Sequence, residues 1–462
     1  MGGFMVSWRL LLAGLVVVLV LGLFLAYLFL YRPGVETTTQ RPGVKLLIVT
    51  RLAPEEGDAL KRRFLASSIA RDYGIVDVEF RKEDVSKWPL YSTGGLGDLF
   101  FIGGYAVYKD LCERGLLAPI DDAEVLRVAE SIGAYIHRGP DGRVCFIAVS
   151  RTIFSYTVNS KFLDKYGLQV PESWDDLAKP EFSKPLLSGE ALISFPKPSK
   201  STTAARTLQL ILQKYGWELG WVILTMMGAN SYIVESSEKA RDDVALGITG
   251  LAPTVLVYGI RAEIESGGNA KFIAAKNGVL PDISPVALAK DTRNKEAALA
   301  FIKWLLSPEG QRALAELFYY LPYIKPEDTL LGRIYEDVSS NIFNYDPEEA
   351  SRWERSVIYY FEAAIADPDT NTLLKKVWVK ALELYSRGLL SRDDLLRIQG
   401  ELGKPLTLRI IVETRDFTRE YAIEINKSIA EDTLFRDKFM DSIKRAAIER
   451  YNSILRELER IG

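Results

Sequence analysis

Histidine, cysteine and methionine are scarce in this chain, which holds one, two and five of them among 462 residues. A metal site built from several histidines is therefore excluded, and a catalytic scheme that needs histidine has one candidate, His137. His137 lies in a turn rich in Gly, Pro, Asp and Arg, so we expect it to face solvent. The formal net charge is −3, so no basic surplus indicates a nucleic-acid partner.

The two cysteines, Cys112 and Cys145, allow at most one intramolecular disulfide. A location outside the cytoplasm would permit that bond. Spacing along the chain does not specify the geometry that a disulfide needs, so two separate buried thiols are the expectation and a disulfide is the alternative.

The composition predicts a folded protein of two or three domains. Hydrophobic residues make up 48% of the chain and charged residues 26%, which is typical of globular proteins. A chain of this length also buries an ample core.

A long apolar run stands near the beginning of the chain. Leu10 to Leu30 are 21 uncharged residues, enough to span a bilayer as a helix. A cleaved signal peptide is the alternative, but no small-residue cleavage site follows the run. We therefore expect an anchor within residues 1–32, followed by an extended linker over residues 33–43.

Strands and helices alternate after the linker. Apolar strands are predicted at 45–50, 76–80 and 98–102, and helices at 54–73 and 106–114. This order predicts an α/β fold with a largely parallel sheet, whose ligands bind beyond the carboxyl ends of the strands. Gly104 and Tyr105 stand at such an end, although an ordinary tight turn has the same residues. A polar break at 150–152 is predicted to separate strand 144–149 from strand 154–158.

Hydroxyl residues gather at two predicted helix starts. Ser199, Lys200, Ser201 and Thr202 precede an apolar helical pattern that ends at Gly216. Ser236 and Ser237 begin another helix about 35 residues later. Such residues cap helices in many proteins, yet a helix start with free N–H groups also suits an anion. Two of them in one region make a shared ligand site more plausible than either alone.

The chain becomes mainly helical after residue 330. The last helix carries an apolar stripe from Met440 to Ile461 at steps of three and four. We expect this stripe to pack on the body, with a coiled coil as the alternative.

Several stretches together resemble the solute-binding proteins of ABC importers, in the type II periplasmic-binding-protein fold. The similarity is greatest to the ferric-iron, aminoethylphosphonate and thiamine branch, and within it to archaeal membrane-tethered members. The stretches are Asp98-Leu-Phe-Phe-Ile-Gly-Gly, Pro171-Glu-Ser-Trp-Asp-Asp-Leu177, Pro196-Lys-Pro-Ser-Lys-Ser201, Tyr215-Gly-Trp-Glu-Leu-Gly-Trp221, Ser284-Pro-Val-Ala-Leu-Ala-Lys290 and Ala297 to Gln311. They cover about residues 45–325.

The resemblance implies two lobes that close on a small solute and then dock on a membrane permease, with the globular body outside the cell. Lobe 1 would comprise residues 44–149 and 285–330, lobe 2 residues 150–284, and residues 331–462 a helical extension. The family's ligand positions fall on eight residues: Gly104, Tyr105, Thr152, Ser199, Ser201, Thr202, Ser236 and Ser237.

The sequence departs from the iron-binding members where they carry a tyrosine pair. Residues 247–255 contain neither tyrosine nor acid, so ferric iron is disfavoured, and no metal or cofactor is expected. The hydroxyls and Lys200 suit a phosphate, a phosphonate or a carboxylate, and a sugar stacked on Tyr105 is the alternative.

Two other classes of function compete with solute binding. An enzyme is disfavoured because Asp175-Asp176 and Asp242-Asp243 are adjacent in sequence, and adjacent side chains point in different directions. A membrane-anchored scaffold with a degenerate cleft, which binds a partner through its C-terminal helices, is the remaining alternative.

Overall fold

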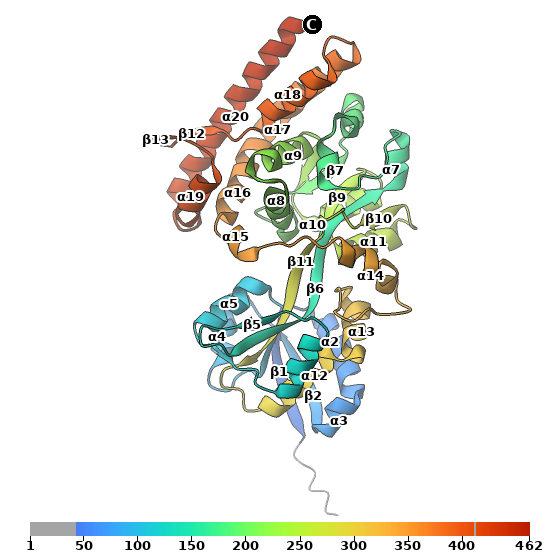
Figure 1. The fold of residues 1–462 in the computed structure, drawn as a ribbon, viewed down its shortest axis with the longest axis vertical. Helices are drawn as coiled ribbons and strands as arrows, with labels where there is room; N and C mark the ends of the chain where they lie inside the picture. The colour runs from blue at the N-terminus through green and yellow to red at the C-terminus, as the bar shows by residue number, and fades with distance from the viewer. Residues whose placement is uncertain (1–42, 411–412) are drawn as a thin grey trace, which may run out of the picture. The chain divides into compact units, whose positions relative to one another are not determined.

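The computed structural model describes residues 43–410 and 413–462. The predicted anchor Leu10–Leu30 and nearly all of the predicted linker lie outside these residues. In the two described ranges, no helix is long and apolar enough to cross a bilayer. Residues 44–462 form one unit, whose elements are shown in Figure 1.

The first strands adopt the predicted βαβ arrangement. Strand β1 (Val44–Thr50) pairs in parallel with β2 (Ile75–Lys82) and with β3 (Leu99–Phe101). Leu46, Ile48 and Val49 of β1 are buried, as expected for a strand with helices packed on both faces. The helices and short strands of this part are α2 (Pro54–Ala66), α3 (Ser68–Asp72), η1 (Val85–Lys87), α4 (Trp88–Ser92), α5 (Tyr105–Glu113), β4 (Leu117–Ala118), α6 (Ala123–Ser131) and β5 (Ile136–Arg138).

The predicted helix over residues 54–73 is two helices. Ser67 has an extended backbone, with φ −70° and ψ 157°, and its hydroxyl accepts the N–H of Ala70. This bond caps α3, so a helix-capping residue inside the apolar pattern divides it.

The predicted break at residues 150–152 is wrong, because β6 (Val144–Asn159) is one continuous strand of 16 residues. Its polar residues lie within a ladder with β11 (Leu280–Ala289), where Thr152 pairs with Asp282 and Ser150 with Ser284. The register shifts between Ser284 and Pro285, where proline lacks the N–H that the ladder would use. Polar residues therefore mark the middle of the strand and not its end.

The sheet continues beyond β6 with a second set of parallel strands. The order of the main path is β2-β1-β3-β11-β6-β9-β7-β8, and β7 pairs in parallel with both β8 and β9. The elements of this part are α7 (Ser160–Lys165), η2 (Trp174–Ala178), η3 (Pro180–Ser188), β7 (Ile193–Pro196), α8 (Thr202–Tyr215), α9 (Trp217–Ala229), β8 (Ser231–Val234), α10 (Ser237–Ala245), β9 (Leu251–Val255), α11 (Leu256–Glu265) and β10 (Ala270–Ile273).

Buried residues form separate clusters at the two ends of the long β6 and β11 strands, which run side by side in Figure 1. One large cluster includes Phe64, Phe101 and Trp304 and receives α12 (Lys295–Leu306) and α13 (Pro308–Phe318). The other includes Trp174 and Trp221. The two long strands thus connect two regions that each have a core.

The C-terminal part shares the second core. Its elements are α14 (Leu330–Ser340), α15 (Pro347–Ser351), α16 (Glu354–Phe361), η4 (Glu362–Ala366), α17 (Pro368–Ser386), α18 (Arg392–Gly403), β12 (Thr407–Ile410), β13 (Glu413–Asp416), α19 (Arg419–Glu431) and α20 (Thr433–Ile461). The ring of Tyr360 lies 4.4 Å from that of Trp221 and 4.0 Å from that of Phe417. In the apolar stripe of α20, Ile443, Ala447 and Tyr451 are buried, so the stripe packs on the body as expected.

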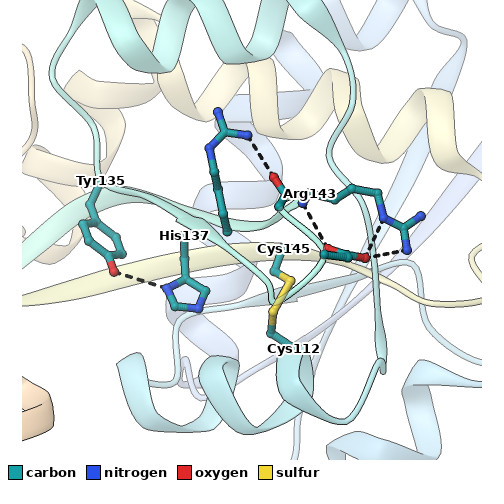
Figure 2. Close-up of a disulfide and its surroundings, with 8 residues drawn as sticks. Cys112, Tyr135, His137, Arg143 and Cys145 are labelled. Atoms are coloured by element: carbon teal, nitrogen blue, oxygen red, sulfur yellow. Dashed lines mark hydrogen bonds and ion pairs between the residues drawn. A yellow bond between two sulfur atoms is a disulfide. The ribbon is translucent and has the colours of Figure 1, made fainter.

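Cys112 and Cys145 form a disulfide, which corrects the expectation of two separate thiols. The bond joins α5 to β6 and lies close to Tyr135 and His137 (Figure 2). Their 33-residue separation did not reveal that the two Cα atoms lie 5.8 Å apart, a distance well suited to a disulfide.

His137 is not a solvent-facing loop residue, as its sequence context predicted. It lies on β5, is half-buried, and its ring stacks on Phe146 with centroids 4.5 Å apart. Burial lowers the pKa of its imidazole, which therefore stays neutral over a wider pH range.

Candidate functional site

The two hydroxyl-bearing helix starts lie together in the structure. Ser201 caps α8 by accepting the N–H of Ala204 at 3.1 Å, and Ser236 caps α10 by accepting the N–H of Lys239 at 3.2 Å. The hydroxyl oxygens of Ser201 and Ser237 are 2.6 Å apart. The residues after β7 and β8, which are parallel neighbours, thus bring two helix N-termini to one place.

Two lysines beside this pair of helix starts share one carboxylate. The Lys197 ammonium lies 2.5 Å from the carboxylate of Glu235, and Lys200 also bonds to it. Hydrogen bonds from Lys197 and Lys200 lower the pKa of Glu235 to about 2. Glu235 is therefore ionised at neutral pH and is the carboxylate that both lysines contact directly.

Ser199 and Thr202 lie next to the hydroxyl pair but make different contacts. The Ser199 N–H donates to the Glu362 carboxylate at 2.8 Å, and Thr202 is exposed on the first turn of α8. Ser199 also lines a pocket of about 370 Å³ with residues of the C-terminal part. An internal carboxylate thus already occupies one backbone donor of the predicted anion site.

Gly104 and Tyr105 form the start of α5. Gly104 has a φ of 84°, which suits glycine, and the preceding Ile102 has a φ of 59°. A β-branched residue is rare in that region and marks a strained turn. The Tyr105 hydroxyl donates to the Glu348 carboxylate at 3.1 Å, and burial raises the pKa of this phenol above its ordinary value.

Thr152 lies beside a half-buried polar cluster that the sequence did not predict. Its pairing partner Asp282 accepts a hydrogen bond from Arg206 at 3.1 Å. Arg206 also donates to the Gln209 side chain at 2.8 Å and to the Tyr345 hydroxyl at 3.2 Å. The available signal was a charged residue inside the apolar face of a predicted helix, five positions after Ser201.

The eight predicted residues do not form one contiguous set. Ser201 and Ser237 touch, with Ser199, Thr202 and Ser236 next to them in sequence. Within residues 43–410 and 413–462, no hydrogen bond joins Tyr105 or Thr152 to this hydroxyl pair. The arrangement offers hydroxyls, helix N-termini and lysines on one part of the sheet and a tyrosine on the other.

The adjacent carboxylates make structural contacts. Asp175 accepts from the Tyr215 hydroxyl at 2.7 Å, and Asp176 accepts the N–H groups of Glu172 and Ser173. The buried Asp243 accepts from the Ser194 hydroxyl at 2.8 Å. In the described part of the chain, no group of three or more His, Cys, Asp or Glu side chains is arranged to hold a metal ion.

Comparison with protein families gives one match that covers just over half of the chain. Residues 98–344 match the family described as bacterial extracellular solute-binding protein. This range includes the hydroxyl-bearing helix starts, both long strands and the polar cluster around Arg206 apart from Tyr345.

Individual relatives match different shares of the chain. The phosphoglycerate transport regulatory protein PgtC of Salmonella typhimurium is 30% identical over 171 residues, which are 37% of this chain and 41% of that protein. The chain therefore matches about two fifths of the length of that relative. An uncharacterized protein of Haemophilus influenzae is 24% identical over 301 residues, which are 62% of this chain and 76% of that protein.

Solved structures show the same fold at low identity. The periplasmic binding protein AfuA from Actinobacillus pleuropneumoniae, with fructose-6-phosphate bound, has a TM-score of 0.52 at 20% identity and covers 70% of this chain and 99% of its own. Iron-bound HitA from Pseudomonas aeruginosa has a TM-score of 0.50 at 22% identity and covers 68% and 99%. The mixed-sheet α/β fold is thus that of type II periplasmic binding proteins.

Proposed function

Since this chain belongs to the bacterial extracellular solute-binding protein family, we propose that it captures a small anionic solute for an ABC importer. Proteins of this family bind small solutes outside the cytoplasm and deliver them to an ABC permease. They are binding proteins and not enzymes, which agrees with the structural contacts of the adjacent carboxylates. The family match also favours solute binding over a scaffold function.

The contact between Ser201 and Ser237 is the observation that carries the proposed site. It joins the N-termini of a 14-residue and a nine-residue helix, and both helix dipoles favour negative charge there. Lys197 and Lys200 lie beside this contact and pair with Glu235, while the Glu362 carboxylate accepts the Ser199 N–H. An anionic solute would compete with these two carboxylates for the lysines and the N–H group. A phosphate, phosphonate or carboxylate group satisfies these donors, with Thr202 and Ser236 beside them.

We propose that residues 44–149 and 285–330 form one lobe and residues 150–284 the other. The separate buried clusters and the two long connecting strands support this division. The register shift at Pro285, in the ladder between β6 and β11, is a suitable point for bending. Closure would bring Gly104 and Tyr105 of the first lobe toward Thr152 and the hydroxyl pair of the second lobe, and would bury the solute.

The names of the relatives indicate which anions to test. One relative is a phosphoglycerate transport regulatory protein, and one neighbour was solved with fructose-6-phosphate. A sugar stacked on Tyr105 is the alternative, and a sugar phosphate combines both kinds of contact. Ferric iron is disfavoured because β9 and its flanks lack the tyrosine pair of iron-binding members.

Isothermal titration of the full-length chain tests the proposal. The panel is 3-phosphoglycerate, fructose 6-phosphate, 2-aminoethylphosphonate, a dicarboxylate, a neutral disaccharide and ferric citrate. We expect one of the anions to bind, to raise the melting temperature, and to bind at least tenfold more weakly to Ser201→Ala/Ser237→Ala. The surface variant Ser131→Ala is the matched control. Binding of the disaccharide or of iron alone would refute the anionic solute.

We propose further that Leu10–Leu30 anchor the protein in the cell membrane and that residues 33–43 link the anchor to the body, as in archaeal membrane-tethered members of the family. The length of the apolar run supports this proposal. Alkaline carbonate extraction of membranes, followed by determination of the mature N-terminus, tests it. Release of the protein, or an N-terminus that begins after the run, would contradict the anchor.

A further inference from the structure

Residues 341–349, which we call the strap, lie along the 150–284 region as an extended segment that ends in α15. Asn341 accepts the N–H of Val279 at 3.0 Å, and the Phe343 N–H donates to Val279 at 2.8 Å. Two hydrogen bonds then join Asp346 to the Gln213 side chain, at 2.8 and 3.0 Å. The strap is therefore hydrogen-bonded to Val279, the residue before β11, and to Gln213 of α8.

Tyr345 of the strap covers the half-buried polar cluster around Arg206. Its hydroxyl donates to Gln209 at 2.7 Å and accepts from Arg206 at 3.2 Å. Among the described residues, the buried Nε of Arg206 and Nε2 of Gln209 have no hydrogen-bond partner. Tyr345 therefore occupies only part of the hydrogen-bonding capacity of Arg206 and Gln209.

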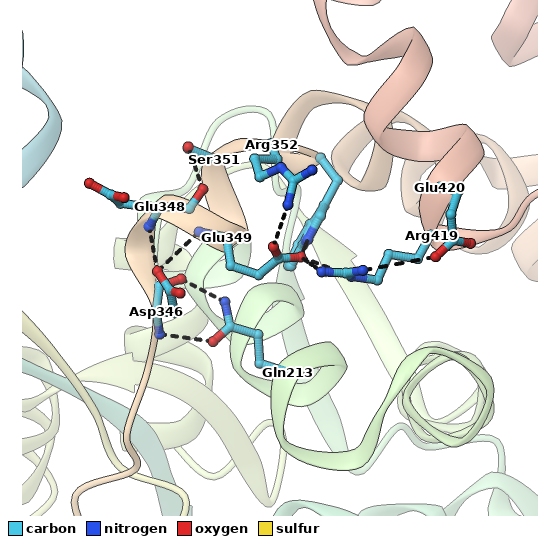
Figure 3. Close-up of polar contacts among 9 residues, drawn as sticks. Gln213, Asp346, Glu348, Glu349, Ser351, Arg352, Arg419 and Glu420 are labelled. Carbon is cyan, nitrogen blue, oxygen red and sulfur yellow. Dashed lines mark hydrogen bonds and ion pairs between the residues drawn. The ribbon is translucent and has the colours of Figure 1, made fainter.

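Glu348 extends from the strap to the other part of the protein. Its carboxylate lies 2.7 Å from the ammonium of Lys109 and 3.1 Å from the hydroxyl of Tyr105, both on α5. The next residue, Glu349, bonds to Arg419 and Trp353 in the C-terminal part. Figure 3 shows Glu348 and Glu349 pointing in opposite directions from α15.

The Glu348 contact places an acidic group on a residue of the proposed site. Tyr105 is one of the predicted ligand positions, and Lys109 is one helical turn further along α5. A carboxylate that binds a tyrosine hydroxyl and an ammonium makes the contacts that an anionic solute would make. Because Lys109 and Glu348 are 32% and 58% exposed, water and solute can reach the pair.

We infer that the strap ties α5 to the 150–284 region in the solute-free protein, and that an anionic solute takes the place of Glu348 on Tyr105. Only the second half of this inference, the displacement of Glu348 by a solute, rests on the proposed function. The strap would thus hold α5 at a fixed distance from the 150–284 region. A solute with its own negative charge would release this tie by replacing Glu348. The C-terminal part gains a role in solute release and capture that the two lobes alone would not have.

Hydrogen exchange of the full-length, solute-free protein tests the tie. Glu348→Lys replaces attraction by repulsion toward Lys109, and we expect amide exchange in residues 104–110 and 341–350 to accelerate by about 2- to 30-fold. Lys109→Glu should act similarly, and the charge-swapped double variant should restore slow exchange. Lys109 also lies 3.8 Å from Glu113, so Glu348→Lys is the primary variant. Glu431→Lys, an equal charge change on α19, is the control.

Unchanged exchange in Glu348→Lys, or a double variant no slower than the single variants, would overturn the tie. The second half is tested with 3-phosphoglycerate and fructose 6-phosphate on Glu348→Gln, which removes the charge and keeps the size. Tighter binding, by up to about fivefold, supports displacement of Glu348, and unchanged affinity refutes it. If neither compound binds the wild type, 2-aminoethylphosphonate and the dicarboxylate take their place, and failure of all four anions refutes the solute proposal. The exchange experiment decides the tie in either case.

Discussion

Removal of the Cys112–Cys145 disulfide should loosen α5 and with it the position of Tyr105. The bond joins the last turn of α5 to β6. Cys112 is buried among Trp88, Tyr108 and other side chains of one cluster. We expect reduction to leave the fold assembled, because the rest of that cluster remains, but to lower the local stability around the bond.

The size of the effect follows from the loop that the bond closes. A loop of 33 residues corresponds to ~3.7 kcal/mol of loop entropy at 25 °C in the chain-entropy model. That free energy equals a roughly 500-fold change in an opening equilibrium, as an upper limit. Amides of α5 and of β5 should therefore exchange up to this much faster, whereas those of α17 and α20 should not change.

The assay is hydrogen exchange with mass spectrometry on oxidised and reduced wild type and on Cys112→Ala/Cys145→Ala. The reduced wild type keeps both sulfur atoms, so its difference from the alanine variant measures the packing contribution. The reasoning is refuted if exchange in α5 is the same with and without the bond. It is also refuted if all helices lose protection equally, since the bond would then control global unfolding.

Three further predictions concern stability. Ser201→Ala should lower the free energy of urea unfolding by ~1–2 kcal/mol through the lost cap and hydroxyl contact, whereas the exposed Ser340→Ala should stay within ~0.5 kcal/mol; equal effects would contradict this. Glu235 has its pKa lowered to about 2, so its ion pairs are present above ~4.5 and are lost as pH falls toward 2. Glu235→Gln should therefore speed exchange in the loop before α8 at pH 7, and its difference from wild type should fall to about half near pH 2. A difference that keeps its full pH 7 size there would disprove the assignment. Removal of residues 331–462 should abolish soluble expression, because Trp221 loses its cover of Tyr360 and Phe417; a soluble product that melts cooperatively would show otherwise.

Local sequence patterns were sufficient to predict most of the secondary structure. The apolar run of β1, the serine cap of α8 and the closing Gly216 each appear where the sequence predicts them. These signals are local because they depend on hydrogen bonds within one turn or on burial of one strand. The continuous β6 was missed because polar residues can lie in a strand when neighbouring strands satisfy their backbone.

The candidate site was only partly accessible to the same reasoning. Serines at two helix starts predicted a shared place, and Ser201 and Ser237 do touch. The sequence predicted neither Arg206 nor Tyr345 as a site residue, because each contact of their cluster joins residues far apart in the chain, 139 positions in the case of this pair. Nor did it predict that Glu348 and Glu362 would occupy donors of the predicted ligand positions.

By itself the sequence determined the elements, their α/β order and the helix starts that carry hydroxyl groups, since hydropathy period and capping are properties of neighbouring residues. Only the tertiary structure decided the disulfide, the polar cluster and the path of the strap. Those features depend on which distant side chains meet, and that is set by how strands pair and helices pack across the whole chain.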